Sequence, residues 1–317
     1  MMTQRLPLQS GSISLRLYPH DLTAPEQIAE LVAQARLGEE SGFDGVMVSE
    51  HHADFPGYLP NPAQVCSFIL PELVSAWAAP CPLLLPIKAH ALVVEELAWL
   101  EAAYPGRVGA GFAAGALPVD FELAEVPFEE VVPRFKAALG PTVSALRGVS
   151  DEPLGRDRAV ARLVDHPLPM AVAVQSKAAA KRAARHGLAV LYDSLQSAER
   201  CAELSSVYRD AGGDAATIAI RRVWIGPAPE AEIAAQLKHY RSYAPPAAVK
   251  RWADEDQTIV AAGAHEAADR LGEMLSRSGC DAVNLRVHVK GLTAGAVRGQ
   301  IGLIGEEFDA FRAALGS

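Results

Sequence analysis

The chain has 317 residues and a formal net charge of −9; 50% of its residues are hydrophobic and 21% are charged. This balance is enough for a large buried core and excludes general disorder, while the acidic charge excludes the basic surface that nucleic-acid binding requires. Residues 1–11 lack the apolar segment of a signal peptide, and no apolar run approaches the roughly 20 residues that span a bilayer, so we expect a cytoplasmic protein that does not bind membranes.

Short apolar segments alternate with longer segments of helical period, which is typical of βαβ units. In the first unit, Ile28, Leu31, Val32 and Ala35 have the i, i+3, i+4, i+7 spacing of an amphipathic helix, and Gly42 follows as a helix stop. Strands are predicted at residues 12–18, 44–48, 82–86, 107–113, 168–174, 188–192, 217–225 and 281–287. Besides this first helix, helices are predicted near 63–77, 91–103, 177–186, 198–211 and 265–278, with a last helix near residue 315.

Eight strands with intervening helices favour an α/β fold of the closed (β/α)8 TIM-barrel type over an open doubly wound sheet. The glycines at 109, 111 and 115 do not have the G-x-G-x-x-G spacing of a dinucleotide-binding loop. Two segments, 118–165 and 227–262, are richer in proline and charge, and we predict that they are insertions in a single domain covering 1–317.

Aromatic residues in the two inserted segments are candidates for the walls of a substrate pocket. Ordinary core packing is the alternative for each of them. These residues are Phe121, Phe128, Tyr240, Tyr243 and Trp252.

The tripeptide Glu50-His51-His52 directly follows the predicted strand at 44–48. Functional groups of a (β/α)8 barrel lie after the strands, because the loops there meet at one end. A histidine exchanges protons near neutral pH, and an adjoining carboxylate orients it or raises its pKa, so we predict catalytic roles for these residues. The alternative is a polar barrel rim with hydrogen-bonded histidines.

A metal site is not expected at this tripeptide. Adjacent residues of an extended segment point to opposite faces, and no H-x-H spacing brings two imidazoles together. The cysteines form no C-x-x-C pair and are interpreted as reduced thiols. They are Cys66, Cys81, Cys201 and Cys280.

Gln175, Ser176 and Lys177 lie where a predicted strand ends and a helix begins. The free amides of a helix start, together with the hydroxyl of an N-cap serine, can hold a phosphate. Lys177 in the first turn opposes the helix dipole, and a bound anion would offset this charge. The alternative is an ordinary serine cap, which needs no ligand.

Small residues, including Gly111 and Ala113, lie along the predicted strand at 107–113 and directly after it. They would let a flat ring approach the backbone, and tight packing between a helix and a strand is the alternative. The Cys81-Pro82 bond lies at the start of the predicted strand at 82–86. The sequence leaves both the cis and the trans form of this bond open.

Several of these stretches resemble the bacterial-luciferase-like flavin monooxygenases. Their order and spacing agree with that family across roughly residues 12–195, and 279–285 (GCDAVNL) agrees more loosely. The matching stretches are 41–52 (SGFDGVMVSEHH), 95–108 (EELAWLEAAYPGRV), Gln175-Ser176 and 185–188 (RHGL).

The resemblance implies a barrel that is usually dimeric through helices near the second and third strands. It also implies that reduced FMN, or its deazaflavin analogue, is held without a dinucleotide-binding motif. In the FMN-dependent members a partner reductase supplies reduced flavin, and oxygen is used to oxidise a carbonyl or another small organic substrate.

By the same resemblance, His51 corresponds to the active-site histidine, with Glu50 and His52 as its neighbours. Ser176 and Gln175 correspond to a phosphate-binding pair, and Arg134 resembles a second phosphate contact. The family's cis peptide falls at Cys81-Pro82, where this chain has a proline.

One departure concerns the cofactor. Luciferases carry a cysteine-arginine pair before the glycine, whereas this chain has Ala113-Ala114-Gly115. Losing a charge-assisted bond to phosphate costs about 1.5–3 kcal/mol unless Lys177 or Arg134 replaces it. The alternatives to a monooxygenase are therefore a deazaflavin-dependent oxidoreductase, a non-catalytic flavin-binding barrel and, from another class, a metal-dependent hydrolase.

Overall fold

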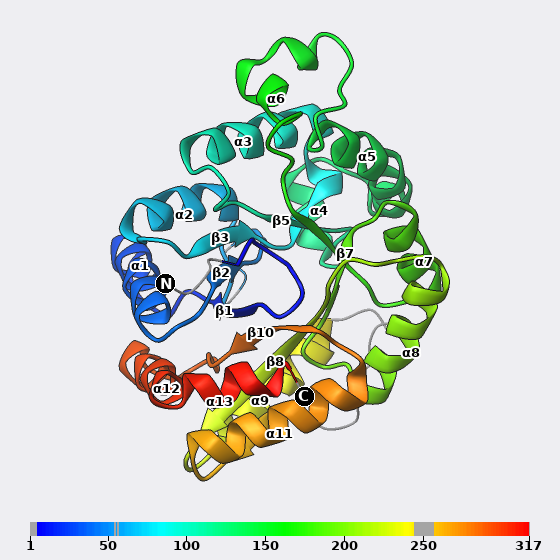
Figure 1. The fold of residues 1–317 in the computed structure, drawn as a ribbon. Helices are drawn as coiled ribbons and strands as arrows, with labels where there is room; N and C mark the ends of the chain where they lie inside the picture. Colours follow the sequence, from blue (N-terminus) through cyan, green and yellow to red (C-terminus); the bar gives the residue numbers. More distant parts are fainter. Residues whose placement is uncertain (1–4, 54, 56, 244–256, 317) are drawn as a thin grey trace.

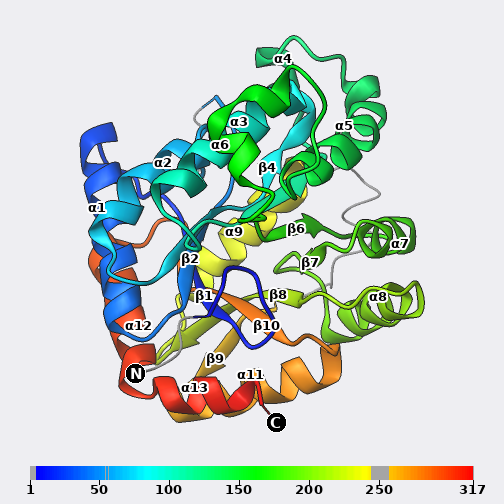
Figure 2. The ribbon, with the colours of Figure 1, turned by 45° about the horizontal axis from the view of Figure 1, so that its top comes forward.

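The computed structural model describes residues 5–53, 55, 57–243 and 257–316. In this part of the chain parallel strands form a nearly closed barrel with helices around it (Figures 1 and 2), which confirms the predicted α/β barrel. A hydrogen bond of 3.0 Å from Ala78 N–H in β3 to the carbonyl of Arg107 connects β3 to the segment just before β5. The barrel strands are β1 (Ile13–Leu17), β2 (Gly45–Val48), β3 (Trp77–Pro80), β5 (Ala110–Ala113), β6 (Met170–Ala173), β7 (Ala189–Tyr192), β8 (Thr217–Ile225) and β10 (Ala282–Arg286).

Helices connect successive strands on the outside of the barrel. The first predicted insertion contains α5, which lies in the ring of helices between α3 and α7 (Figure 1). No helix of the described residues is both long and apolar enough to span a bilayer. The helices are α1 (Ala24–Glu40), α2 (Pro62–Ile69), α3 (His90–Ala103), α4 (Pro118–Leu123), α5 (Val131–Ala145), α6 (Arg158–Arg162), α7 (Lys177–Arg185), α8 (Ala198–Asp210), α9 (Glu230–Tyr243), α11 (Ala264–Ser278), α12 (Ala294–Glu306) and α13 (Phe308–Ala314).

The region around the third strand differs from the prediction. The predicted strand at 82–86 is reduced to β4 (Leu83–Leu84), and the third barrel strand is β3, whose first residue was assigned to a helix. Helix α2 ends at Ile69, where a short turn containing a proline follows, because proline cannot continue the helix hydrogen bonds. The ring of Trp77 fills the space next to Gly45, where a Cβ would lie 2.1 Å from it. Packing against the neighbouring strand therefore determines β3.

Two further elements were not predicted. Strand β9 (Ile259–Ala261) lies at the end of the second predicted insertion and pairs in parallel with the carboxyl-terminal part of β8. Helix α12 precedes the predicted terminal helix, which is α13. Short elements such as β9 give little periodic signal in a sequence.

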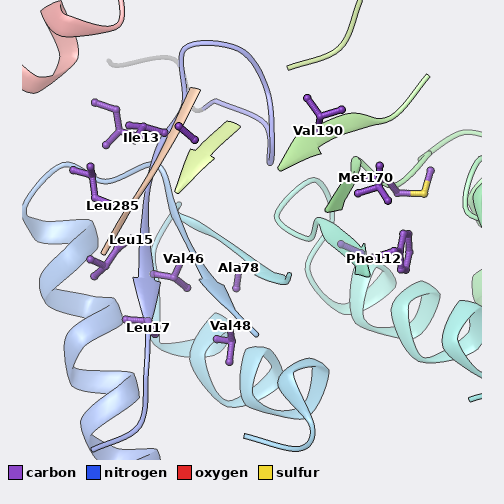
Figure 3. Packing of buried hydrophobic residues seen from close by; sticks show 14 of the residues in the cluster. Ile13, Leu15, Leu17, Val46, Val48, Ala78, Phe112, Met170, Val190 and Leu285 are labelled. Carbon is purple, nitrogen blue, oxygen red and sulfur yellow. The ribbon is translucent and has the colours of Figure 1, made fainter. Parts of the chain in front are cut away.

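Two apolar layers hold the barrel together. Ile13, Leu15 and Leu17 of β1 belong to the core between the strands and the helices, part of which is seen in Figure 3. Alternate residues of a strand face opposite sides, so Ser14 and Arg16 point into the barrel. The interior contains a second apolar cluster, formed by Leu8, Met47, Trp77, Ala79, Cys81, Ala171, Ala189, Leu191, Ala216, Ile218, Ile220 and Ala282.

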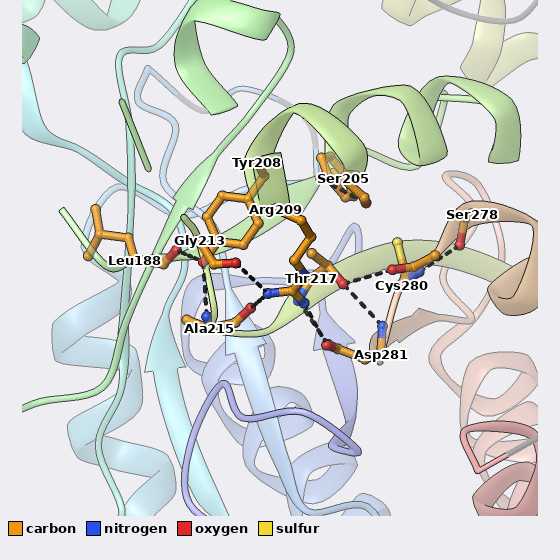
Figure 4. Close-up of polar contacts among 12 residues, drawn as sticks. Leu188, Ser205, Tyr208, Arg209, Gly213, Ala215, Thr217, Ser278, Cys280 and Asp281 are labelled. Carbon is orange, nitrogen blue, oxygen red and sulfur yellow. Dashed lines mark hydrogen bonds and ion pairs between the residues drawn. The ribbon is translucent and has the colours of Figure 1, made fainter. Parts of the chain in front are cut away.

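A polar network joins the amino ends of β7, β8 and β10 (Figure 4). Asp281 accepts hydrogen bonds from Thr217 N–H at 2.8 Å and from Arg209 Nη2 at 2.9 Å. Tyr208 Oη donates to the carbonyl of Leu188 at 2.8 Å. Catalytic groups of such barrels lie at the opposite end, so this network is a structural feature.

Candidate active site

The loop after β2 brings His51 against a buried carboxylate. His51 Nδ1 donates to Asp120 Oδ2 at 2.8 Å, and the backbone N–H of His52 donates to Asp120 Oδ1 at 2.8 Å. Asp120 lies on α4 and is only 1% exposed. With Nδ1 held by the carboxylate, Nε2 of His51 is the ring nitrogen that can exchange a proton with a ligand.

Glu50 and His52 form a second pair. Glu50 is buried, its Oε2 accepts the backbone N–H of Leu84 at 2.5 Å, and its Oε1 lies 3.4 Å from His52 Nε2. The contact with Glu50 raises the pKa of His52 above its ordinary value, although burial acts in the opposite direction. The two adjacent histidines thus have separate carboxylate partners. Among the described residues no three His, Cys, Asp or Glu side chains are grouped to hold a metal ion.

Ser176 is the N-cap of α7, as the sequence predicted. Its Oγ accepts the backbone N–H of Ala179 at 3.2 Å. Gln175 Nε2 donates to Asp193 Oδ2 at 3.3 Å, and Lys177 Nζ lies 2.7 Å from Glu203 Oε1. Because β2 and β6 run parallel in one barrel, Glu50 and Ser176 follow the same ends of their strands.

Arg134 lies in the first turn of α5 and pairs with Glu130 at 2.7 Å. The next residue, Phe135, packs beneath Arg182 of α7, with the guanidinium carbon 5.5 Å from the ring centroid. Helices α5 and α7 are therefore neighbours, and both begin after the carboxyl end of a barrel strand. The ion pairs of Arg134 and Lys177 are largely exposed, and such pairs contribute only about 0–1 kcal/mol, so either cation can turn to another anion.

Cys81-Pro82 is a cis peptide. Cys81 is fully buried and packs on Gly111, where a Cβ would lie 2.1 Å from Cys81 Sγ. This contact supports the packing interpretation of Gly111. Ala113 is half-buried at the end of β5, where it pairs with Leu84 of β4.

Sequence reasoning did not select Asp120, Tyr18 or Arg286. Tyr18 directly follows β1 and Arg286 is the last residue of β10, whereas the predicted strands at 12–18 and 281–287 included both residues. Asp120 lies in the first inserted segment and shows no local pattern. Its role becomes visible only when the fold brings it to the loop after β2.

The aromatic candidates in the insertions have different surroundings. Phe121 and Phe128 pack on each other with centroids 5.6 Å apart. Tyr240 is buried and bonds to Arg286. Trp252 and the side chain of Tyr243 lie outside the described residues.

Residues 10–306 match the family model described as luciferase-like monooxygenase. The alkanal monooxygenase alpha chain of Photorhabdus laumondii is 27% identical over 116 residues, which are 37% of this chain and 32% of that relative. The matched part therefore spans about a third of the curated relative's length.

Solved structures share the fold at low sequence identity. One is the oxygenating constituent of 3,6-diketocamphane monooxygenase from Pseudomonas putida, in complex with FMN; its TM-score is 0.76 at 14% identity, with 93% of this chain and 97% of that chain covered. Another is an F420-dependent secondary alcohol dehydrogenase in complex with an F420-acetone adduct, with a TM-score of 0.73, 15% identity and coverage of 96% and 99%.

Proposed function

Because this chain belongs to the luciferase-like monooxygenase family, we propose that it is a flavin-dependent monooxygenase that uses reduced FMN and O2 to oxidise a small organic substrate. The observation that carries this proposal is the hydrogen bond of 2.8 Å between His51 Nδ1 and the buried Asp120, at the end of the barrel where such enzymes react. A histidine held in one tautomer by a carboxylate is a proton-exchange device, and a plain polar rim would not require it.

The residues after β6 fit the phosphate of a flavin nucleotide. The first amides of α7 and the Ser176 hydroxyl would hold it, and Lys177 and Arg134 can supply positive charge in place of the family's arginine. Reduced FMN, when bound, supplies the electrons with which O2 is activated. Without a replacement for the arginine the affinity would be about ten- to hundredfold lower, which a flavin that is received and released in each cycle can tolerate.

The chain's own groups have separate tasks. Nε2 of His51 exchanges a proton with the bound substrate or cofactor, and Asp120 keeps the ring oriented. His52 and Glu50 hold the loop after β2 in place, because Glu50 contacts His52 and also accepts the backbone N–H of Leu84. An oriented acid–base group of this kind contributes about 10²–10⁴-fold to a rate.

The cofactor is tested by anaerobic titration with reduced FMN and with reduced F420, a deazaflavin. Binding of FMN supports the monooxygenase, whereas binding of F420 alone supports the deazaflavin-dependent oxidoreductase, the second candidate. If neither binds at tens of micromolar, the proposal fails. A barrel that binds flavin but shows no O2-dependent turnover would match the non-catalytic alternative, which Ala113-Ala114 favours.

A matched pair of variants tests the phosphate site. Ser176 caps α7 and Ser197 caps α8 in the same way, each accepting one backbone N–H at 3.2 Å. Both Ser→Ala changes should lower the free energy of unfolding by about 0.5–2 kcal/mol. Only Ser176→Ala should weaken the binding of reduced FMN. Equal FMN affinities in the two variants would contradict the assignment.

We also propose a homodimer and a separate flavin reductase as partners. Exposed apolar side chains on α2 and α3, namely Phe68, Leu92 and Trp99, support a dimer face there. A hollow of about 620 Å³ lies between these helices. Light scattering on wild type and on Phe68→Asp tests the dimer, and reductase-coupled turnover tests the second partner.

A further inference from the structure

A buried guanidinium, that of Arg286, lies at the carboxyl end of β10. Arg286 is 2% exposed, its Nη2 donates to Tyr240 Oη at 2.6 Å, and its Nε donates to the carbonyl of His288 at 3.3 Å. The guanidinium carbon lies 4.2 Å from the centroid of the Tyr18 ring. Within the described residues, two of its five N–H donors therefore make hydrogen bonds.

No carboxylate of the described residues neutralises this cation. The partners of Arg286 are a tyrosine hydroxyl, a carbonyl and two aromatic rings. Arg312, by contrast, lies 2.8 Å from Asp44. An arginine stays protonated even when it is buried, and an uncompensated buried charge destabilises a protein. An anion that binds beside Arg286 therefore stabilises the protein.

The neighbouring cation strengthens this local charge. Arg16, on β1, donates to Asn284 Oδ1 at 2.5 Å and to the carbonyl of Cys81 at 3.1 Å, both neutral acceptors. Burial raises the pKa of Tyr18, but the nearby charges of Arg286 and Arg16 lower it more. The pKa of Tyr18 therefore lies below its ordinary value. Two guanidinium groups thus make this end of the barrel electropositive.

His288 adds an unused polar atom. It is 4% exposed, and its Nδ1 has no hydrogen-bond partner among the described residues. Its ring stacks on Tyr18 at 5.2 Å and meets His20 at 5.0 Å. Burial, followed by the charge of Arg286, lowers the pKa of His288 well below its ordinary value, so the ring is neutral at pH 7. A neutral imidazole can donate a hydrogen bond to an anion without being charged itself.

Aromatic contacts connect this group to the proposed catalytic histidine. On one side Tyr18 lies 5.3 Å from Tyr58, which lies 4.5 Å from His51. On the other side Tyr240 lies 6.4 Å from His239, which stacks at 5.7 Å on Phe55, and Phe55 lies 5.2 Å from His51. These contacts close a ring that contains both Arg286 and His51.

We propose that Arg286, with Tyr18, Tyr240 and His288, binds the carboxylate of an organic acid that is the substrate of this enzyme. The planar guanidinium matches a carboxylate, and its unused donors provide the bonds. In this proposal the acid's remaining part extends along the aromatic contacts toward the proton-exchanging histidine. The proposal rests on the proposed function for the reaction, but the binding of the acid itself requires no cofactor.

The test measures binding to the purified full-length protein by calorimetry. The ligands are octanoate and benzoate, with octanol and benzyl alcohol as their neutral counterparts. Each acid should bind at least about tenfold more tightly than its alcohol, since a charge-assisted hydrogen bond contributes on this scale. Acids that bind no better than the alcohols would overturn the proposal.

Three variants locate the anion. Arg286→Met should weaken acid binding by about ten- to hundredfold, and Arg286→Lys, which keeps the charge but not the planar donors, should fall between it and wild type. Arg298→Met is the matched control, because Arg298 is already paired with Glu30 and its loss changes the net charge equally. If Arg298→Met weakens acid binding as much as Arg286→Met does, only long-range charge is involved and the proposal is wrong.

The cofactor titration shows whether Arg286 binds the carboxylate of the substrate or an anionic group of the cofactor. If Arg286→Met weakens reduced FMN but not octanoate, the cation faces the cofactor and the substrate assignment is overturned. If wild type binds acids but neither reduced cofactor, the proposed function fails while the acid site stands. Near-ultraviolet circular dichroism confirms that each variant is folded, and Arg286→Lys carries the test if Arg286→Met is not.

Discussion

Replacing Asp120 with asparagine tests the role assigned to His51 most directly. The buried carboxylate accepts two hydrogen bonds of 2.8 Å, from His51 Nδ1–H and from the backbone N–H of His52. Asparagine has nearly the same shape, and its oxygen can still accept from the backbone. Its NH2 group then faces His51 Nδ1, which must accept a hydrogen bond, so the ring proton moves to Nε2. The base of the proposed proton exchange is then lost.

The magnitude follows from these two bonds. A hydrogen bond to a charged group contributes about 1.5–3 kcal/mol to stability, and asparagine keeps one of the two in neutral form. We expect the free energy of unfolding of Asp120→Asn to fall by about 1–3 kcal/mol. The turnover number should fall further, by about 10²–10⁴-fold, because the wrong tautomer removes acid–base catalysis. The affinity for the reduced cofactor should not change.

Nitrogen-15 chemical shifts of the His51 ring report its tautomer without any substrate. Wild type should show protonated Nδ1 and the variant protonated Nε2. Glu122→Gln is the control, since Glu122 is an exposed carboxylate on the same helix and should affect neither the tautomer nor turnover. A folded Asp120→Asn protein that retains protonated Nδ1 and wild-type turnover would contradict the role assigned to Asp120.

Three other changes test the surrounding structure. Because the pKa of His52 is raised, its pair with Glu50 stabilises the fold fully below the ordinary pKa of 6.5, and this stabilisation is lost as the pH rises through the raised pKa. Urea unfolding of His52→Gln between pH 5 and pH 9 should therefore lack this pH-dependent decrease in the free energy of unfolding. Gly111→Ala should destabilise the barrel by about 1–3 kcal/mol, because the new Cβ would lie 2.1 Å from Cys81 Sγ, and Cys81→Ala should partly restore the melting temperature. Asp281→Asn should lower the free energy of unfolding by about 1 kcal/mol, since the ion pair of Asp281 with Arg209 on α8 is about one-third exposed. Cofactor binding at the opposite end of the barrel should be unchanged in titrations of this variant.

The sequence predicted the barrel because its signals are local. Short apolar runs mark the strands, and helical periods mark the connections, so most elements lie within a few residues of their predicted positions. The exception is β3, where alanines and a proline give no clear pattern. Its first residue, Trp77, is fixed by contact with Gly45 on another strand, and a contact between distant segments leaves no periodic trace.

The predicted site residues and the missed ones differ for a related reason. His51 and Ser176 follow strands, and strand ends can be located from local pattern. Asp120 and Tyr240 come from the segments after β5 and β8, whose path over the barrel has no simple sequence rule. The sequence therefore predicted the proton-exchanging group but not the carboxylate that orients it.

The cationic end of the barrel, by contrast, had a readable signal. In β10 the polar Asn284 and Arg286 alternate with Val283 and Leu285, and β1 alternates in the same way. Strands of a parallel barrel are covered by helices on one face, so a polar alternate set must face the barrel interior. The register pairs the inward residues of the two strands. Polar residues on neighbouring strands of a barrel therefore predict a polar mouth, and a charged residue at the last inward position predicts that the mouth binds an ion.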